Sequence, residues 1–409
     1  MSQSLISGNS LPRVIAFVGS YGAQPDAEGG GVYVLNVGAE GANLEVTDHI
    51  TAPVEAGYLV YSQSNGILYV VDERKTDGRG PVSPPAAVHA LSVNQVDGSL
   101  TQLNWQSAPG PRPTFLSYSA KHRLLVSANH GDFQHVEKVT RGDDGTWSTE
   151  YVYDDSTVVV YGVTPDGGVG AIKDLVVFEG HGLDPNKSPQ NAGHAQASPH
   201  AHCAVLDPSE KYVLVCDKGT DRIYVYALGS KLELVSVCQF PQETAPRHIA
   251  FSSGTRLYLT LELSSELAAL DFCPESGVLT LVSRVSTVSS SFSGLNEPAE
   301  VRAHPNGRFV YVNNRGEDSL AWFDVQQDAG LVRIGAVQLA KSLHPGLAAR
   351  SFSFDPSGTF MLVADRPAHL VRSYAVSGID GSLTHQTDVA VPDPAYIEFA
   401  ELPSQPLKP

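Results

Sequence analysis

The chain has 409 residues and a net charge of −17, from 27 basic and 44 acidic residues. The basic residues form no continuous run, which argues against nucleic acid as a partner. With 42% apolar and 17% charged residues, the composition is that of an ordinary globular protein, unlike a disordered or a membrane chain. These features predict a folded protein with a large core.

The first residues of the chain and its cysteines indicate the cellular compartment in which the protein is expected. The first apolar run, Val14–Val18, is far too short for a signal peptide or a membrane span. The four cysteines, Cys203, Cys216, Cys238 and Cys273, occur singly without C-x-x-C spacing and are expected to be core residues in a reducing compartment. We therefore expect a cytoplasmic protein with neither membrane nor nucleic-acid partners. The sequence does not indicate an oligomeric partner.

A unit of short apolar segments recurs along the chain. It is clearest at residues 198–228, where three β-prone runs are separated by the turn-forming clusters Asp-Pro-Ser-Glu and Asp-Lys-Gly-Thr-Asp. This pattern predicts an antiparallel meander. One residue near the end of the second strand marks each copy: Gly19, Asp72, Asn129, Asp217, Glu262, Asn314 and Asp365. The steps are 45 to 57 residues, apart from 88 residues between Asn129 and Asp217.

A period of this length, built from short strands, is typical of a β-propeller with four strands per blade. The seven copies predict an all-β, seven-bladed propeller over residues 14–402, with flexible termini at 1–13 and 403–409. The last strand, Tyr396–Glu401, has no meander of its own. We expect it to pair beside Val14–Val18 and to close the ring, which removes an exposed sheet edge.

The separation of 88 residues between Asn129 and Asp217 predicts an insertion in blade three. Its outer strands are expected at residues 157–163 and 171–178, followed by a loop at residues 179–199 without periodicity. This segment and the start of the next strand carry His181, His194, His200 and His202. Long loops in compact domains are usually functional.

Charged residues gather where the first strand of each blade begins and the second ends, and a meander places these two points on one face. At least five arginines and four histidines therefore converge on one mouth of an acidic protein, a funnel that concentrates small anions. The mouth residues of blades two to seven are Tyr58, Asp72, Glu73, Arg112, Asn129, His130, His200, His202, Asp217, Arg247, His248, Glu262, Glu300, Arg302, Asn314, Arg315, Arg350, Asp365 and Arg366.

Several stretches resemble the seven-bladed propeller lactonase family, the 6-phosphogluconolactonase type, which is related to fungal 3-carboxy-cis,cis-muconate cyclase. They are HG at 181–182, HAH at 200–202, PRH at 246–248, LTLEL around Glu262, NNRG at 313–316 and the closing VPDPAYIEF. Family members share a His, two Arg and a Glu but act on different anions. By motif these are His202, Arg247, Glu262 and Arg315.

The resemblance implies a cytoplasmic hydrolase of carbohydrate metabolism in the pentose phosphate pathway. Its expected reaction is hydrolysis of the lactone of an anionic sugar acid, foremost 6-phosphogluconolactone. The alternatives are a carboxymuconate-lactonising enzyme and a non-catalytic interaction platform.

Lactone hydrolysis needs a base, an oxyanion donor and a substrate clamp. Glu262 or His202 is the candidate base, and Arg247 faces the carbonyl. Arg315, with Arg302 or Arg350, suits an anion clamp. His181, His200 and His248 complete the substrate-binding set.

Each assignment has a structural alternative. Glu262 could be a solvated carboxylate at a strand end. Arg247 and Arg315 could instead form structural salt bridges between blades. His200 and His202 lie on the same side of a strand and, with His181 or His194, could form a His₃ metal site. The resemblance implies a metal-independent site, so we expect neither a metal nor another cofactor.

Overall fold

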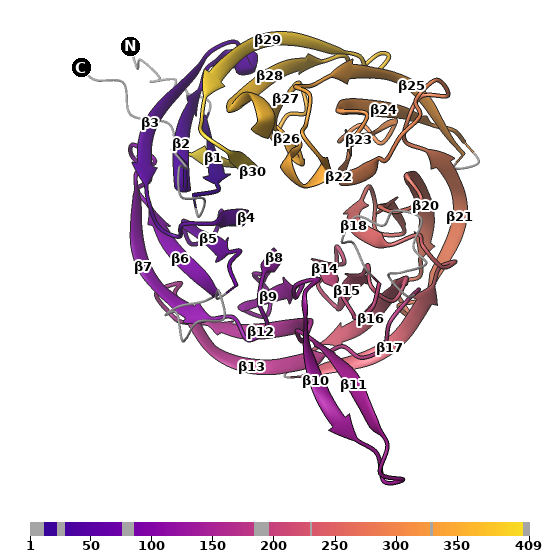
Figure 1. Ribbon diagram of the computed structural model, residues 1–409. Coiled ribbons are helices and arrows are strands. Elements are labelled where there is room, and N and C mark those ends of the chain that lie inside the picture. The colour runs from indigo at the N-terminus through magenta and orange to yellow at the C-terminus, as the bar shows by residue number, and fades with distance from the viewer. Residues whose placement is uncertain are drawn as a thin grey trace, which may run out of the picture.

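Each repeat folds into a four-stranded antiparallel sheet, and seven such sheets form a ring around a central axis in the computed structural model (Figure 1). The structure describes residues 12–22, 29–75, 86–183, 196–229, 231–327 and 330–403. The predicted seven-bladed propeller is confirmed. Residues 1–11 and 404–409, at the predicted flexible termini, and His194 lie outside the described residues.

The strands fall into four concentric sets. The strands nearest the axis are β30 (Pro394–Leu402), β4 (Ala56–Ser62), β8 (Pro113–Ser119), β14 (Ala201–Leu206), β18 (Pro246–Phe251), β22 (Glu297–Ala303) and β26 (Ser351–Phe354). The second set comprises β1 (Arg13–Ser20), β5 (Ile67–Asp72), β9 (Leu124–Asn129), β15 (Tyr212–Asp217), β19 (Arg256–Leu261), β23 (Phe309–Arg315) and β27 (Phe360–Asp365).

The two outer sets complete the blades. The third strands are β2 (Gly31–Val37), β6 (Ala87–Val93), β12 (Thr157–Val163), β16 (Arg222–Leu228), β20 (Glu266–Phe272), β24 (Ser319–Val325) and β28 (Leu370–Val376). The outermost are β3 (Leu44–Ile50), β7 (Leu100–Ser107), β13 (Val169–Val177), β17 (Leu232–Gln239), β21 (Leu279–Ser286), β25 (Leu331–Gln338) and β29 (Leu383–Ala390). The described residues also form short 3₁₀ turns at η1 (Ala39–Gly41), η2 (Pro345–Leu347) and η3 (Arg366–Ala368).

Burial explains the sequence pattern of these sets. The second strand β5 is buried along its whole length, because both of its faces pack against neighbouring blades. After its buried first residue, the outermost strand β7 carries only exposed and partly buried residues, since it lies at the rim of the ring. No helix in the described part of the chain has the length and apolarity that a membrane span requires.

The ring closes as the sequence predicts. Strand β30 pairs antiparallel with β1, with Val14 opposite Glu401 and Val18 opposite Ile397. The end of the chain thus supplies the innermost strand of blade one. This pairing joins the two ends of the chain in one sheet.

Polar side chains tie neighbouring blades together beside the axis. The Thr114 hydroxyl donates to the His202 carbonyl oxygen at 3.1 Å, and the Thr260 hydroxyl donates to the Ala299 carbonyl oxygen at 3.0 Å. These bonds fix the backbone of the inner strands relative to the next blade. They therefore set the positions of side chains near the axis.

Blade three contains an unpredicted element. A hairpin of β10 (His135–Arg141) and β11 (Trp147–Tyr153) lies between β9 and β12 and projects away from the ring (Figure 1). The 88-residue step therefore has two causes, this hairpin and the predicted segment after β13. The signal in the sequence is the turn-forming Gly-Asp-Asp-Gly at residues 142–145, between two β-prone runs.

Candidate active site

The first strand of each blade begins beside the end of the second, as the meander predicts. Ala201 pairs with Asp217, Pro246 with Leu261, and Glu297 with Arg315. Residues that are far apart in the sequence therefore meet at one mouth of the ring.

The inner strands are irregular at their starts, and this irregularity builds a pocket near the axis. Register shifts interrupt β4, β8, β14, β18 and β22 within their first few residues. A bulge re-aims side chains relative to a regular strand. The residues at these shifts include Tyr58, Thr114, His202, Arg247, His248 and Glu300, which all line one small pocket. We call it the axial pocket.

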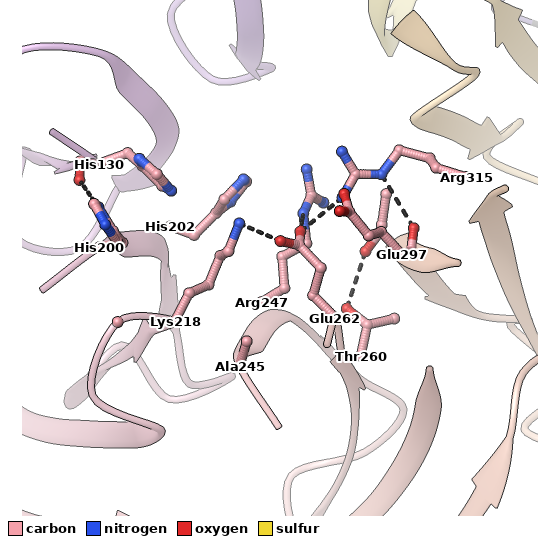
Figure 2. A network of polar contacts seen from close by, with 12 residues as sticks. His130, His200, His202, Lys218, Ala245, Arg247, Thr260, Glu262, Glu297 and Arg315 are labelled. Atoms are coloured by element: carbon pink, nitrogen blue, oxygen red, sulfur yellow. Dashed lines mark hydrogen bonds and ion pairs between the residues drawn. The ribbon is translucent and has the colours of Figure 1, made fainter. Parts of the chain in front are cut away.

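A buried carboxylate organises the charges beside the axial pocket. The Glu262 side chain has no exposed surface, and its Oε2 lies 2.7 Å from Arg247 Nε and 2.7 Å from Arg315 Nη2. Lys218 Nζ forms an ion pair with its other oxygen (Figure 2). Arg315 also contacts Glu297 Oε2 at 3.1 Å. Glu262 therefore binds three cations that come from three blades, and it is not the solvated carboxylate of the alternative interpretation.

Lys218 was missed in the sequence. It directly follows Asp217, just as Arg315 directly follows Asn314. That equivalence was the available signal. Burial lowers the pKa of Lys218 from its usual value, while the charge of Glu262 opposes the shift.

Burial also changes the basicity of the groups around the axial pocket. It lowers the pKa of Arg247 to about 10, an effect that the charge of Arg315 reinforces, so the guanidinium stays charged at neutral pH. Burial, with the charge of Arg247, lowers the pKa of His248 to about 4 and that of His202 well below 6.5. Both imidazoles are therefore neutral at neutral pH.

Three residues that line the axial pocket have a buried side-chain nitrogen without a hydrogen-bond partner in the described part of the chain. Arg247 Nη1, His202 Nδ1 and His248 Nε2 have no hydrogen-bond partner among the described residues. Buried polar atoms are normally hydrogen-bonded. The axial pocket has a volume of about 10 Å³, close to the room that one water needs. A sugar lactone must therefore lie mainly outside it.

A wider cavity of about 710 Å³ lies at the mouth, and Arg350 lines both spaces. We call this space the mouth cavity. It is large enough for a sugar-sized ligand. The arrangement thus combines a narrow charged pocket with a broad adjoining space.

The other predicted residues fall into different places. His200 is buried and stacks on His130, with its Nδ1 3.0 Å from the His130 carbonyl oxygen. Arg302 contacts Glu300 at 3.3 Å and donates to the Tyr396 hydroxyl at 2.6 Å. Neither contact joins Arg302 to Arg315, its predicted partner in the anion clamp.

His181 is separate. It is exposed, its Nδ1 contacts the carbonyl oxygen of the adjacent Gly182, and no contact within the described residues links it to Glu262. The described residues include no group of three or more His, Cys, Asp or Glu side chains arranged to hold a metal ion.

The fold and the site together define a seven-bladed propeller with a buried, positively charged centre at one mouth. Residues 15–399 match the family described as lactonase, 7-bladed beta-propeller, and the chain belongs to this family. It is 27% identical to a 6-phosphogluconolactonase from Bacillus subtilis over 394 residues, 95% of this chain and 99% of that relative. A 6-phosphogluconolactonase from Formosa agariphila is 22% identical and covers 86% of this chain and 89% of its own.

Solved structures agree on the fold. A protein from Lactobacillus plantarum has a TM-score of 0.78 and 25% identity, and covers 96% of this chain and all of its own. The periplasmic gluconolactonase from Pseudomonas aeruginosa has a TM-score of 0.77 and 23% identity, with the same coverage.

Proposed function

We propose that this protein hydrolyses the lactone of an anionic sugar acid, and that the substrate is 6-phospho-D-glucono-1,5-lactone. One observation carries the proposal: Arg247 and His202 line the same axial pocket, and each has a buried side-chain nitrogen without a hydrogen-bond partner among the described residues. Family membership supports a lactone as the substrate. The name of the Bacillus subtilis relative supports the phosphorylated one.

In this proposal Arg247 is the oxyanion donor. Its Nε contacts Glu262, its Nη1 has no hydrogen-bond partner in the described chain, and the residue lines the axial pocket. Such a guanidinium is preorganised, because the carboxylate holds it before the substrate arrives. Lys218 and Arg315 contact the same carboxylate and are positioning residues.

The proton acceptor in this proposal is His202. Glu262 is the weaker candidate, because three cations stabilise its charged form. His202 is neutral at neutral pH, because burial lowers its pKa. Its unpartnered Nδ1 accepts a proton from water while the water oxygen bonds to the lactone carbonyl carbon.

The remaining steps of the hydrolysis need no further reactant. The carbonyl electron pair moves to its oxygen, which Arg247 stabilises. When the carbonyl re-forms, the bond to the ring oxygen breaks, and that oxygen takes the proton from His202. The product is the open-chain acid.

The test is a spectroscopic comparison of freshly made 6-phosphogluconolactone and a carboxymuconate as substrates. We expect fast turnover of the lactone alone and, in Arg247→Ala, a loss of about 10²–10³ in kcat. Arg333→Gln is the matched control, since it breaks a rim ion pair with Glu317 away from the axis. Turnover of the muconate alone would overturn the hydrolase proposal.

A further inference from the structure

The mouth cavity has a composition unlike that of the whole chain. Five cationic side chains line it, against four carboxylates, an excess of one positive charge in a chain of net charge −17. The cations come from blades two, three and seven, and His135 and Val152 at the base of the β10–β11 hairpin form part of the wall. The hairpin of blade three thus borders the space in which a sugar-sized ligand would lie.

Two of the cations share an aromatic ring. The guanidinium carbon of Arg350 lies 5.1 Å and that of Arg366 lies 4.5 Å from the centre of the Tyr21 ring. Glu73 accepts from Arg350 at 2.9 Å, and Asp393 accepts from Arg366 at 3.2 Å. Each guanidinium has five N–H donors, so these carboxylates orient the two groups and leave donors for another anion.

A third cation of the mouth cavity, Arg112, has an unfavourable backbone conformation. Arg112 has φ +56°, in the left-handed region that favours glycine. Its side chain is 43% exposed and lies 3.5 Å from Asp132 at the mouth cavity. Arg112 therefore adds a third guanidinium to the lining of the mouth cavity.

We propose that the mouth cavity is the subsite for an anionic group on the substrate, remote from the lactone carbonyl, and that Arg350, Arg366 and Arg112 bind it. The inference rests on the proposed lactonase activity and specifies which end of the substrate each space accepts. Arg350 lines both spaces, and the proposal places the lactone carbonyl at the axial pocket and the anionic group in the mouth cavity. Guanidinium groups bind phosphate through paired N–H donors.

The test compares 6-phosphogluconolactone with glucono-1,5-lactone in the wild type, Arg366→Gln and Arg112→Gln. Each variant should raise KM for the phosphorylated lactone by about 10- to 100-fold and change its kcat less than about twofold. The preference for the phosphorylated lactone in kcat/KM should fall accordingly. Arg333→Gln should keep the wild-type preference. An unchanged preference in both cavity variants, or a wild type without preference, overturns the subsite.

Binding separates this inference from the proposed function. Calorimetry should show that the wild type binds 6-phosphogluconate more tightly than gluconate, and that Arg366→Gln and Arg112→Gln lose this difference. If the wild type hydrolyses neither lactone but shows this binding pattern, the proposed activity fails and the subsite stands. Equal binding of the two acids overturns the subsite whatever the activity.

Discussion

Replacing Glu262 by glutamine should destabilise the protein and slow the reaction, because Lys218, Arg247 and Arg315 share this carboxylate. Removing one partner of a buried ion pair costs about 3–5 kcal/mol. With an unfolding entropy of about 2.1 cal/mol/K per residue and 409 residues, this corresponds to about 3–6 °C in Tm. The displaced Arg247 should also lower kcat by about 10²–10³.

The destabilisation should depend on pH through Lys218. Burial holds its pKa below 10.5, and Glu262 opposes that shift, so the folded-state pKa falls further in the variant. Between the folded and unfolded pKa values the unfolded chain binds more protons, and stability rises with pH. The pH range between the folded-state and unfolded-state pKa of Lys218 is wider in Glu262→Gln, because its folded-state pKa is lower there. The Tm difference from the wild type should therefore be smaller at a pH just below 10.5 than at neutral pH.

The assay is thermal unfolding at both pH values, with kcat measured on the same samples. Adding Lys218→Met to Glu262→Gln removes one uncompensated cation and should recover part of the lost Tm. If Glu262→Gln has the same Tm as the wild type at both pH values, Glu262 is not the counter-ion that the three cations share. The account of the site would then fail.

Three further outcomes are expected. A chain ending at Ala390 lacks β30, which closes blade one against β1, and its Tm should fall well below that of the full chain; an equal Tm would contradict this closure. Because burial lowers the pKa of His202 well below 6.5, kcat should hold as the pH falls to about 6, and an acid limb near pH 7 would contradict His202 as the base. Activity should survive EDTA, and a loss that zinc reverses would refute a metal-independent reaction.

Much of the architecture could be read from the sequence, because its signals are local. Turn-forming clusters and short β-prone runs mark the blades, and the unpaired segment at 396–401 marks the closing strand. The β10–β11 hairpin carries the same kind of signal. It was missed because the long step already had an explanation in the histidine-containing segment that follows.

The candidate site was only partly predictable. The meander places His202, Arg247, Glu262 and Arg315 at one mouth, as expected from strand starts and ends. The register shifts that bring His202 and Arg247 to the axial pocket have no signal that we recognised in the sequence.

The sequence by itself determined the number of blades, the way the ring closes and the mouth at which the charged residues gather. The tertiary structure alone decided which of those charges are buried and which groups neutralise them. Glu262 binds cations from its own blade and from both neighbouring blades. The energy of a charge depends on the solvent and counter-ions around it, and neighbours from other blades supply both.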